Sequence, residues 1–348
     1  MIHICYSVYD KTGRYSKFAG TSMASIFENT NQDVTIHLLH DNTLTTENRD
    51  KFVRLAEKYD QQIEFYNVEN LFGDQLKYIV EKIPKVKESH VSIGAFYRLF
   101  IAKVLSNDIH KAIYLDSGDT IVNLDIKELW DINLENKPLA AVPEALNKTN
   151  PKVTHLYLVL ENIVKYEDYF NSGILVMNLD YFRENEEVLK RGINFRVEHS
   201  YYEYMDQDIL NYCFADDYVK LPVKFNSFTW VERLFYKTQK AEKKIYHYSG
   251  GVNLEFDLND TLNNLYFKYF VKTPWFNFDT LANFSATFYK FYNEQKAQLL
   301  YFTNLLGKKR RAFFVDKNHF EMLKNIFSIT DDEEIIETTT PPPPPMYY

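Results

Sequence analysis

The sequence contains few cysteines. Only Cys5 and Cys213 occur among the 348 residues, and both stand in apolar contexts. Two isolated cysteines give neither the disulfide framework of a small secreted protein nor a thiolate metal site. We therefore expect the protein to work in a reducing compartment. A chain of this length can bury a substantial core in one large domain with an appendage, or in two modest domains.

The sequence also lacks a secretion signal, a long apolar run and a surplus of positive charge. Its first seven residues have no basic region or cleavage site and are typical of a strand. No later stretch approaches the roughly 20 apolar residues of a membrane span, so we expect a cytoplasmic protein. With 40 basic and 48 acidic residues the formal charge is -8. This balance argues against binding nucleic acid through its phosphates.

Short apolar runs alternate with segments of helical periodicity through the first two thirds of the chain. This alternation is typical of βαβ units around a mostly parallel sheet, so the sequence predicts an α/β fold. The predicted strands are 2–7, 34–39, 63–66, 111–115, 173–178 and 244–247, and the predicted helices are 15–28, 46–59, 92–105, 181–196 and 208–214.

The chain changes character after Trp275. Residues 276–330 have aromatic stripes at helical spacing and predict a C-terminal helical extension. Residues 331–348 hold an acidic run, three threonines and five consecutive prolines, and they predict a disordered tail. The expected domains are therefore a catalytic domain at 1–275, the helical extension and the tail.

Apolar and aromatic residues adjoin four cations in the predicted extension, between positions 299 and 314. A helical surface of this composition suits an anionic membrane face, which gives an expectation of peripheral contact with the inner face of the plasma membrane. Packing of the apolar stripe against the catalytic domain, with the cations in solvent, is the alternative.

An acidic pair, Asp116 and Asp119, follows the predicted strand 111–115. Ligands of open α/β sheets bind outside the carboxyl ends of the strands, so a site belongs here. Two carboxylates in one cleft suit a hard divalent cation, which can in turn bind a diphosphate. Taken alone, the pair fits a solvated turn with Asp116 capping backbone amides better than a metal site. The wider sequence context has to decide between the two.

The run Ile113-Tyr114-Leu115-Asp116-Ser117-Gly118-Asp119 resembles the metal-binding strand of the family 8 retaining glycosyltransferases. That family includes lipopolysaccharide glucosyl- and galactosyltransferases and, more distantly, glycogenin. Its usual motif is Asp-x-Asp, whereas this chain has Asp-x-x-Asp. Four further segments match in order along the chain: Tyr97-Arg98-Leu99, Phe170-Asn171-Ser172-Gly173, Asp206-Gln207-Asp208 and His247-Tyr248-Ser249-Gly250. The resemblance spans residues 2 to 275 and implies a GT-A type nucleotide-diphospho-sugar transferase fold.

The resemblance implies a role for each matching residue. His247 is expected to complete a metal site with Asp116 and Asp119, and the metal is expected to be Mn²⁺ or Mg²⁺, with the imidazole favouring Mn²⁺. Asp206 and Gln207 are expected to line the catalytic face beside the anomeric carbon. Donor binding is expected from Tyr9 and Asp10 near the uracil, Arg98, Asn171, Ser172, Asp206 and Gln207 near the sugar, and Gly250 and Lys272.

The function that the resemblance implies is transfer of a hexose, glucose or galactose, from a UDP-sugar to a glycan or lipid-linked glycan acceptor. The expected setting is the synthesis of lipopolysaccharide or another cell-envelope polysaccharide. Two other functions stay open. A nucleotide-sugar-binding protein without turnover would hydrolyse no UDP-hexose with Mn²⁺, and a glycogenin-like self-glucosylating protein would gain mass with the donor alone.

Overall fold

The computed structural model describes residues 1–13, 15–83, 86, 93–147, 156–249 and 260–276, and three short strands at 300–301, 312–315 and 335–337. These residues form two compact units, Met1–Val252 and Asn253–Tyr348. The end of the catalytic domain at residue 275 stays a prediction.

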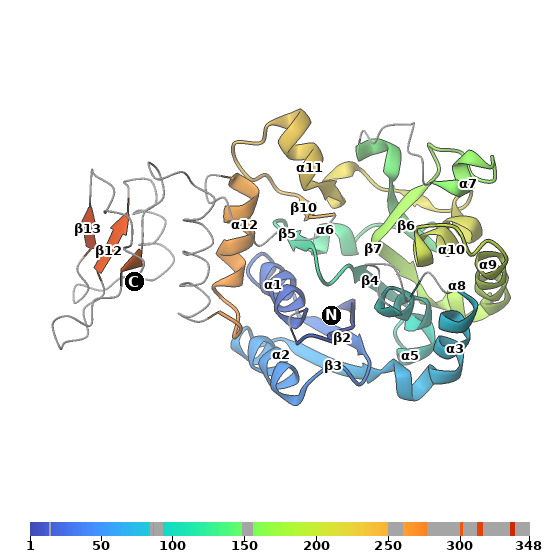
Figure 1. Cartoon of the computed structure of the whole chain (residues 1–348), viewed down its shortest axis with the longest axis horizontal. Coiled ribbons are helices and arrows are strands. Elements are labelled where there is room, and N and C mark those ends of the chain that lie inside the picture. The colour runs from blue at the N-terminus through green and yellow to red at the C-terminus, as the bar shows by residue number, and fades with distance from the viewer. Residues whose placement is uncertain are drawn as a thin grey trace, which may run out of the picture. The chain divides into compact units, whose positions relative to one another are not determined.

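The first unit is built around a seven-stranded sheet with the order β3-β2-β1-β4-β7-β6-β8 (Figure 1). The strands are β1 (Ile2–Val8), β2 (Val34–His40), β3 (Gln62–Asn67), β4 (Lys111–Leu115), β6 (Leu139–Pro143), β7 (Phe170–Asn178) and β8 (Val219–Lys220). Strands β3, β2, β1 and β4 are mutually parallel, β7 is antiparallel to β4 and β6, and β6 and β8 are parallel. The predicted α/β fold with a mostly parallel sheet is confirmed.

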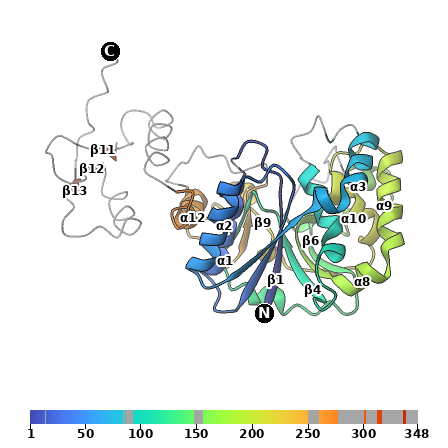
Figure 2. The same cartoon turned by 90° about the horizontal axis from the view of Figure 1, so that it is seen from below.

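Helices cover both faces of this sheet, which explains why β1, β2 and β4 are buried along almost their whole length. Figure 2 shows α1 (Ser16–Phe27) and α2 (Thr46–Lys58) on one side, and α3 (Val68–Lys82), α8 (Leu179–Glu184) and α9 (Glu186–Glu198) on the other. The carboxyl ends of β1 and β4 lie side by side, because the two strands are parallel neighbours in the sheet.

Two predicted helices differ from the observed elements. The segment predicted as helix 92–105 forms a 3-10 helix, η1 (Ile93–Phe100), followed by one α-helical turn, α5 (Ile101–Val104). The predicted helix 181–196 is divided into α8 and α9 at Asn185, whose backbone is not helical. Asparagine favours such breaks because its side chain competes for nearby backbone groups, and here the Asn185 amide donates to the carbonyl of Tyr181.

A second, three-stranded sheet lies in the same unit with the order β5-β10-β9. It consists of β5 (Thr120–Val122), β9 (Ser227–Phe228) and β10 (Ile245–His247). The antiparallel register sets His247 opposite Thr120, and the amide of Tyr248 donates to the carbonyl of Asp119 at 2.7 Å. This pairing joins two segments that lie far apart in the sequence.

The second unit contains α12 (Thr261–Phe270), which Asp260 caps by accepting from two amides of the first turn. It also contains strands β11 (Leu300–Tyr301), β12 (Ala312–Val315) and β13 (Ile335–Glu337). The helical extension at 276–330 and the disordered tail at 331–348 stay predictions. The remaining residues of 277–348 lie outside the described part of the chain.

None of the helices that the structure describes is long and apolar enough to cross a bilayer.

Candidate active site

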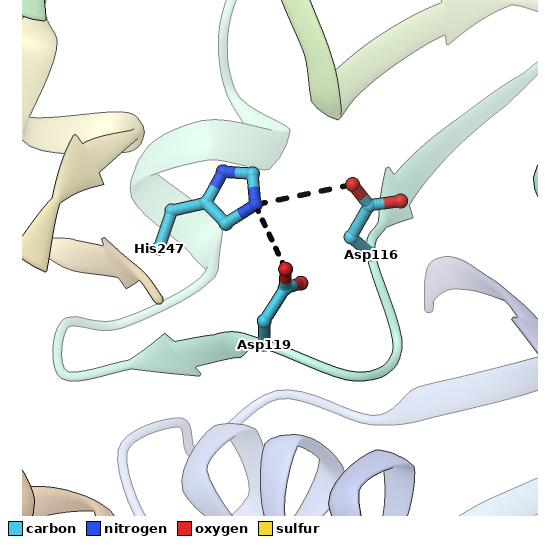
Figure 3. A group of neighbouring side chains, drawn as sticks. All are labelled: Asp116, Asp119 and His247. Carbon is cyan, nitrogen blue, oxygen red and sulfur yellow. Dashed lines mark ion pairs between the residues drawn. The ribbon is translucent and has the colours of Figure 1, made fainter. Parts of the chain in front are cut away.

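Two carboxylates and one imidazole meet at the end of β4 (Figure 3). Asp116 directly follows β4, Asp119 directly precedes β5, and His247 is the last residue of β10. Nε2 of His247 lies 3.3 Å from Oδ2 of Asp119 and 3.9 Å from Oδ2 of Asp116. One ligand atom from each residue lies within 4.8 Å of the others. We call these three residues the metal cluster.

The metal cluster fits a divalent cation. Among the described residues, Oδ1 of Asp119 is buried without a hydrogen-bond partner. Burial alone would lower the pKa of His247, but the carboxylates of Asp119 and Asp116 outweigh it and raise the pKa. The pocket therefore favours positive charge. Two carboxylate oxygens and one nitrogen form a donor set that suits Mn²⁺, and less well Mg²⁺.

The Asp-x-x-Asp spacing is accommodated by a tight turn. The hydroxyl of Thr120 donates to the carbonyl of Asp116 at 2.7 Å and closes the turn, so both carboxylates still face His247. Gly118 lies under Tyr15 in this turn, where an added Cβ atom would stand 2.3 Å from the tyrosine oxygen. The extra residue therefore does not separate the acidic pair.

The orientation of His247 is fixed by a buried asparagine. Nδ1 of His247 lies 2.9 Å from Oδ1 of Asn226, whose amide nitrogen donates to Oδ1 of Asn171 at 2.8 Å. Because Asn226 presents its oxygen to the ring, Nδ1 carries a proton and donates it. In the neutral ring the lone pair then belongs to Nε2, the atom that faces Asp119.

Arg98, on η1, connects the metal cluster to a second acidic group. Its guanidinium lies 2.7 Å from Oδ1 of Asp116 and 3.0 Å from Oδ2 of Asp206. It also donates to the carbonyl of Ser172 at 2.8 Å and lies over the ring of Tyr114 at 4.2 Å. Only 5% of Arg98 is exposed. A buried guanidinium with these partners is held in one orientation.

The second acidic group, which we call the buried acidic cluster, consists of Asp206, Gln207 and Asp208 at the start of α10 (Met205–Phe214). Oε1 of Gln207 accepts from the Ser172 amide at 2.9 Å and from Nδ2 of Asn171 at 3.1 Å. Burial raises the pKa of Asp206 and of Asp208 to about 6, against the opposing effect of Arg98 on Asp206.

Asp208 has hydrogen-bond donors at both carboxylate oxygens. Oδ1 accepts from the hydroxyl of Tyr169 and Oδ2 from the amide of Tyr204, each at 2.9 Å. Asp208 is completely buried. The hydrogen bonds therefore hold this carboxylate in place without a cation.

Gly173 allows β7 to pass close to the metal cluster. A Cβ atom at this position would lie 2.5 Å from Cε1 of His247 and 2.7 Å from Oδ2 of Asp116, distances that side chains do not tolerate. The Gly173 carbonyl accepts from the Asp116 amide at 2.7 Å. The predicted Asn-Ser-Gly segment therefore belongs to the same site as the acidic pair.

A cavity of about 220 Å³ opens beside these groups. Its lining consists of Ser7, Tyr9, Tyr15, Gly94, Ala95, Arg98, Tyr114, Asp116, Ser117 and Asp119. Tyr9 therefore lies where a donor could contact it. Asp10, in contrast, is buried and accepts hydrogen bonds from the amides of Tyr15 and Ser16 and from the side chain of Asn48, so both of its oxygens are occupied near the start of α1.

Two predicted donor-binding residues, Gly250 and Lys272, are not among the described residues of the first unit. Gly250 falls outside the described residues, as does most of the surface 299–314. Lys272 follows α12 in the second unit. The donor-binding roles of Asp10, Gly250 and Lys272 stay predictions.

Two polar residues of the site were not identified from the sequence. Glu144 follows β6, hydrogen bonds to Asn171, and has a pKa that burial raises to about 7 against the effect of His247. Its position at a strand end could have suggested it. Asn226 is the other, and no motif in the segment around it indicates that it faces a histidine 21 residues later.

The sequence matches the model of glycosyl transferase family 8 over residues 7–252. General stress protein A of Bacillus subtilis is 26% identical over 286 residues, which cover 77% of this chain and 93% of that protein. The lipopolysaccharide 1,3-galactosyltransferase of Salmonella typhimurium is 25% identical over 212 residues, which cover 60% of this chain and 59% of that protein.

A solved structure of the galactosyltransferase LgtC, in complex with donor and acceptor sugar analogs, superimposes with a TM-score of 0.62 at 18% identity. The superposition covers 80% of this chain and 98% of that one. At this identity the likeness concerns the fold, and it supports the GT-A architecture.

Proposed function

The chain belongs to glycosyl transferase family 8, and from that membership we propose that it transfers a hexose from a UDP-sugar to a hydroxyl of a cell-envelope glycan. The observation that carries the proposal is the metal cluster next to the 220 Å³ cavity, joined through Arg98 to the buried acidic cluster. The name of the Salmonella relative motivates the acceptor class. We place the reaction in the cytoplasm, at the inner face of the envelope.

Asp116, Asp119 and His247 would hold a divalent cation, Mn²⁺ by preference. When bound, the cation would neutralise the negative charge of the diphosphate leaving group. The chain's own residues supply the rest of the site. Arg98 is a fixed positive charge at its centre, and Tyr9 provides an aromatic face in the cavity for the uracil.

We assign the sugar to the face formed by Asn171, Ser172, Asp206 and Gln207. Hydrogen bonds already hold these side chains in place, so little reorganisation is needed when the donor binds. Asp206 lies 3.0 Å from Arg98 and is almost completely buried. An aspartate bound to a guanidinium is a weak nucleophile. We therefore propose attack by the acceptor on the same face as the departing diphosphate, which retains the anomeric configuration.

A donor screen tests the proposal directly. The purified chain is incubated with UDP-glucose, UDP-galactose and other UDP-sugars, with Mn²⁺ or with EDTA, and UDP release is measured. We expect release from one UDP-hexose with Mn²⁺ and none with EDTA, and an α-linked product by NMR once an acceptor is found. A protein that hydrolyses no UDP-sugar, or a β-linked product, would contradict the proposal.

A further inference from the structure

A loop beside the metal cluster exposes apolar side chains to solvent. Residues 229–244, here called the docking loop, connect β9 to β10, and they include α11 (Thr229–Val231) and the π-helical turn η4 (Glu232–Tyr236) (Figure 1). At the tip of this loop, the exposed fractions are 66% for Leu234, 54% for Phe235 and 44% for Tyr236. Three consecutive large apolar residues with this exposure suggest a contact surface.

Hydrogen bonds to a buried glutamate fix the conformation of the loop below these side chains. Glu232 is 1% exposed and accepts from the hydroxyl of Ser227 at 2.6 Å and from Nζ of Lys244 at 2.8 Å. The hydroxyl of Thr238 donates to its other oxygen. Lys237 adopts a left-handed conformation, with φ of 48°, and ends the π-helical turn. The hydrogen bonds of Glu232 and the backbone conformation of Lys237 therefore hold the loop in the conformation that exposes the tip.

The charge around the tip is positive, although the whole chain carries -8. Between residues 232 and 244 there are five basic and two acidic residues, which give a local charge of +3. Both acidic residues, Glu232 and Glu242, are paired with Lys244, at 2.8 and 2.6 Å. Lys237, Lys240 and Lys243 are exposed. The loop thus combines an apolar tip with cations whose charge the local acids do not cancel.

A row of aromatic rings connects the tip to the metal cluster. The ring of Phe235 lies 6.2 Å from that of Trp230, Trp230 lies 6.4 Å from Phe228, and Phe228 lies 5.4 Å from the ring of His247. These are centroid distances typical of packed aromatic pairs. The tip therefore lies on the same side of the unit as the strand that ends in His247, separated from it by Trp230 and Phe228.

We propose that the docking loop binds the surface of an anionic lipid bilayer. Leu234, Phe235 and Tyr236 enter the headgroup region, and Lys237, Lys240 and Lys243 contact the anionic headgroups. Exposed apolar and aromatic side chains flanked by lysines are the composition of segments that lie in the interface of a bilayer. Docking here holds the catalytic site at the membrane face, where a lipid-linked glycan presents its sugar. The role for a lipid-linked acceptor rests on the proposed function, whereas the binding of the bilayer does not.

The structure offers a matched control surface. Leu160 and Ile163 are 52% and 42% exposed, similar to the tip, but their neighbour Glu161 is acidic and accepts from the hydroxyls of Tyr201 and Tyr202. An anionic bilayer repels such a surface. Replacing Leu160 and Ile163 removes a similar exposed apolar area without touching the docking loop.

Flotation of the full chain with vesicles tests the proposal, using phosphatidylcholine alone or mixed with phosphatidylglycerol, at low salt. We expect binding only to the mixed vesicles. Binding should be about a hundredfold weaker in Lys237→Gln/Lys240→Gln/Lys243→Gln, because each cation near the surface contributes about fivefold. It should be at least about tenfold weaker in Leu234→Ser/Phe235→Ser, and unchanged in Leu160→Ser/Ile163→Ser.

UDP-hexose hydrolysis is measured on the same variants, and all of them should retain it, which separates the docking surface from the transfer reaction. No binding of the unaltered chain to mixed vesicles would overturn the proposal. Equal binding by the triple lysine variant and the unaltered chain would also overturn it, and so would a concentration-dependent dimer that only Leu234→Ser/Phe235→Ser abolishes, in the absence of vesicle binding.

Discussion

The metal cluster and the buried acidic cluster both contain aspartates, but the two clusters differ in the hydrogen-bond donors around the carboxylates. In the metal cluster, Asp116 and Asp119 face each other and His247 across a partly open pocket, and one buried oxygen of Asp119 has no hydrogen-bond partner among the described residues. In the buried acidic cluster, Asp206 is held by Arg98 and Ser172, and Asp208 has a donor at each oxygen.

The difference distinguishes carboxylates that are available to bind a cation from carboxylates that hydrogen bonds hold in a structural role. Within the described part of the chain, Oδ1 of Asp119 lacks a donor and lies near a second carboxylate, which favours a cation there, whereas both oxygens of Asp208 have donors and need no cation. Arg98 forms ion pairs with Asp116 of the metal cluster and with Asp206 of the buried acidic cluster, so it connects the two clusters. The predictions below test this division of roles, beginning with the largest expected effect.

Removing a metal ligand should have the largest effect on activity. We expect Asp119→Ala and His247→Ala each to lower metal-dependent UDP-hexose turnover by at least about a thousandfold, because the charge of the leaving group is no longer neutralised. His110→Ala is the control, since His110 forms an exposed pair with Asp180 outside the site. Circular dichroism checks folding. Full turnover in either ligand variant would disprove the metal assignment.

Replacing Arg98 should damage both clusters together. Arg98→Met leaves Asp206 buried without its cation, and we expect the free energy of unfolding to fall by about 3–5 kcal/mol. Urea denaturation measures the loss, and Arg54→Met on the exposed face of α2 is the control. An unchanged stability would mean that Asp206 is neutral in the folded protein and that Arg98 does not support it.

Replacing Asn226 should weaken metal binding without removing a ligand. In Asn226→Ala the Nδ1 proton of His247 loses its acceptor, so the ring can turn and exchange tautomers. We expect Mn²⁺ affinity to fall about 10- to 100-fold by isothermal titration. The ¹⁵N shifts of His247 in the metal-free protein should show a mixed tautomer. An unchanged Kd together with an unchanged tautomer would contradict the orienting role.

The pH dependence of stability should distinguish Asp208 from the metal ligands. Its pKa is raised by burial to about 6, so the folded state binds the proton more tightly than the unfolded state does. The stabilising contribution of the protonated form is therefore complete below about pH 4 and is lost as the pH rises through about 6.

In Asp208→Asn this pH dependence disappears. We expect the stability lost through the substitution to be smaller at pH 7 than at pH 4, by up to about 3 kcal/mol. Urea denaturation across this pH range gives the difference. A constant difference between the two proteins at every pH would show that burial does not raise the pKa of Asp208.

Much of the fold and the site could be predicted from the sequence, because both depend on local patterns. The apolar run before Asp116 identified β4 and placed the acidic pair at a sheet edge, and ordered motifs added Arg98, Asn171 and His247. These residues do lie together in the structure. The roles assigned to them stay proposals.

The rest depends on long-range contacts that no local pattern encodes. Asn226 faces His247 only because β9 and β10 are neighbours in a small sheet, and strands of two or three residues have too few positions for a period to be recognised. In the sequence, Asp119 and Asp208 are both acidic residues of segments that resemble the family's motifs. Only the number of donors around each carboxylate distinguishes the ligand from the support.

Equilibrium binding of Mn²⁺ tests the division between the two clusters most directly. The cation is titrated into the unaltered chain, Asp119→Asn and Asp208→Asn, in the presence of UDP, and free Mn²⁺ is followed by electron paramagnetic resonance. We expect one bound ion for the unaltered chain and for Asp208→Asn, and loss of that ion in Asp119→Asn. Retention of the ion in Asp119→Asn, or its loss in Asp208→Asn alone, would contradict the account.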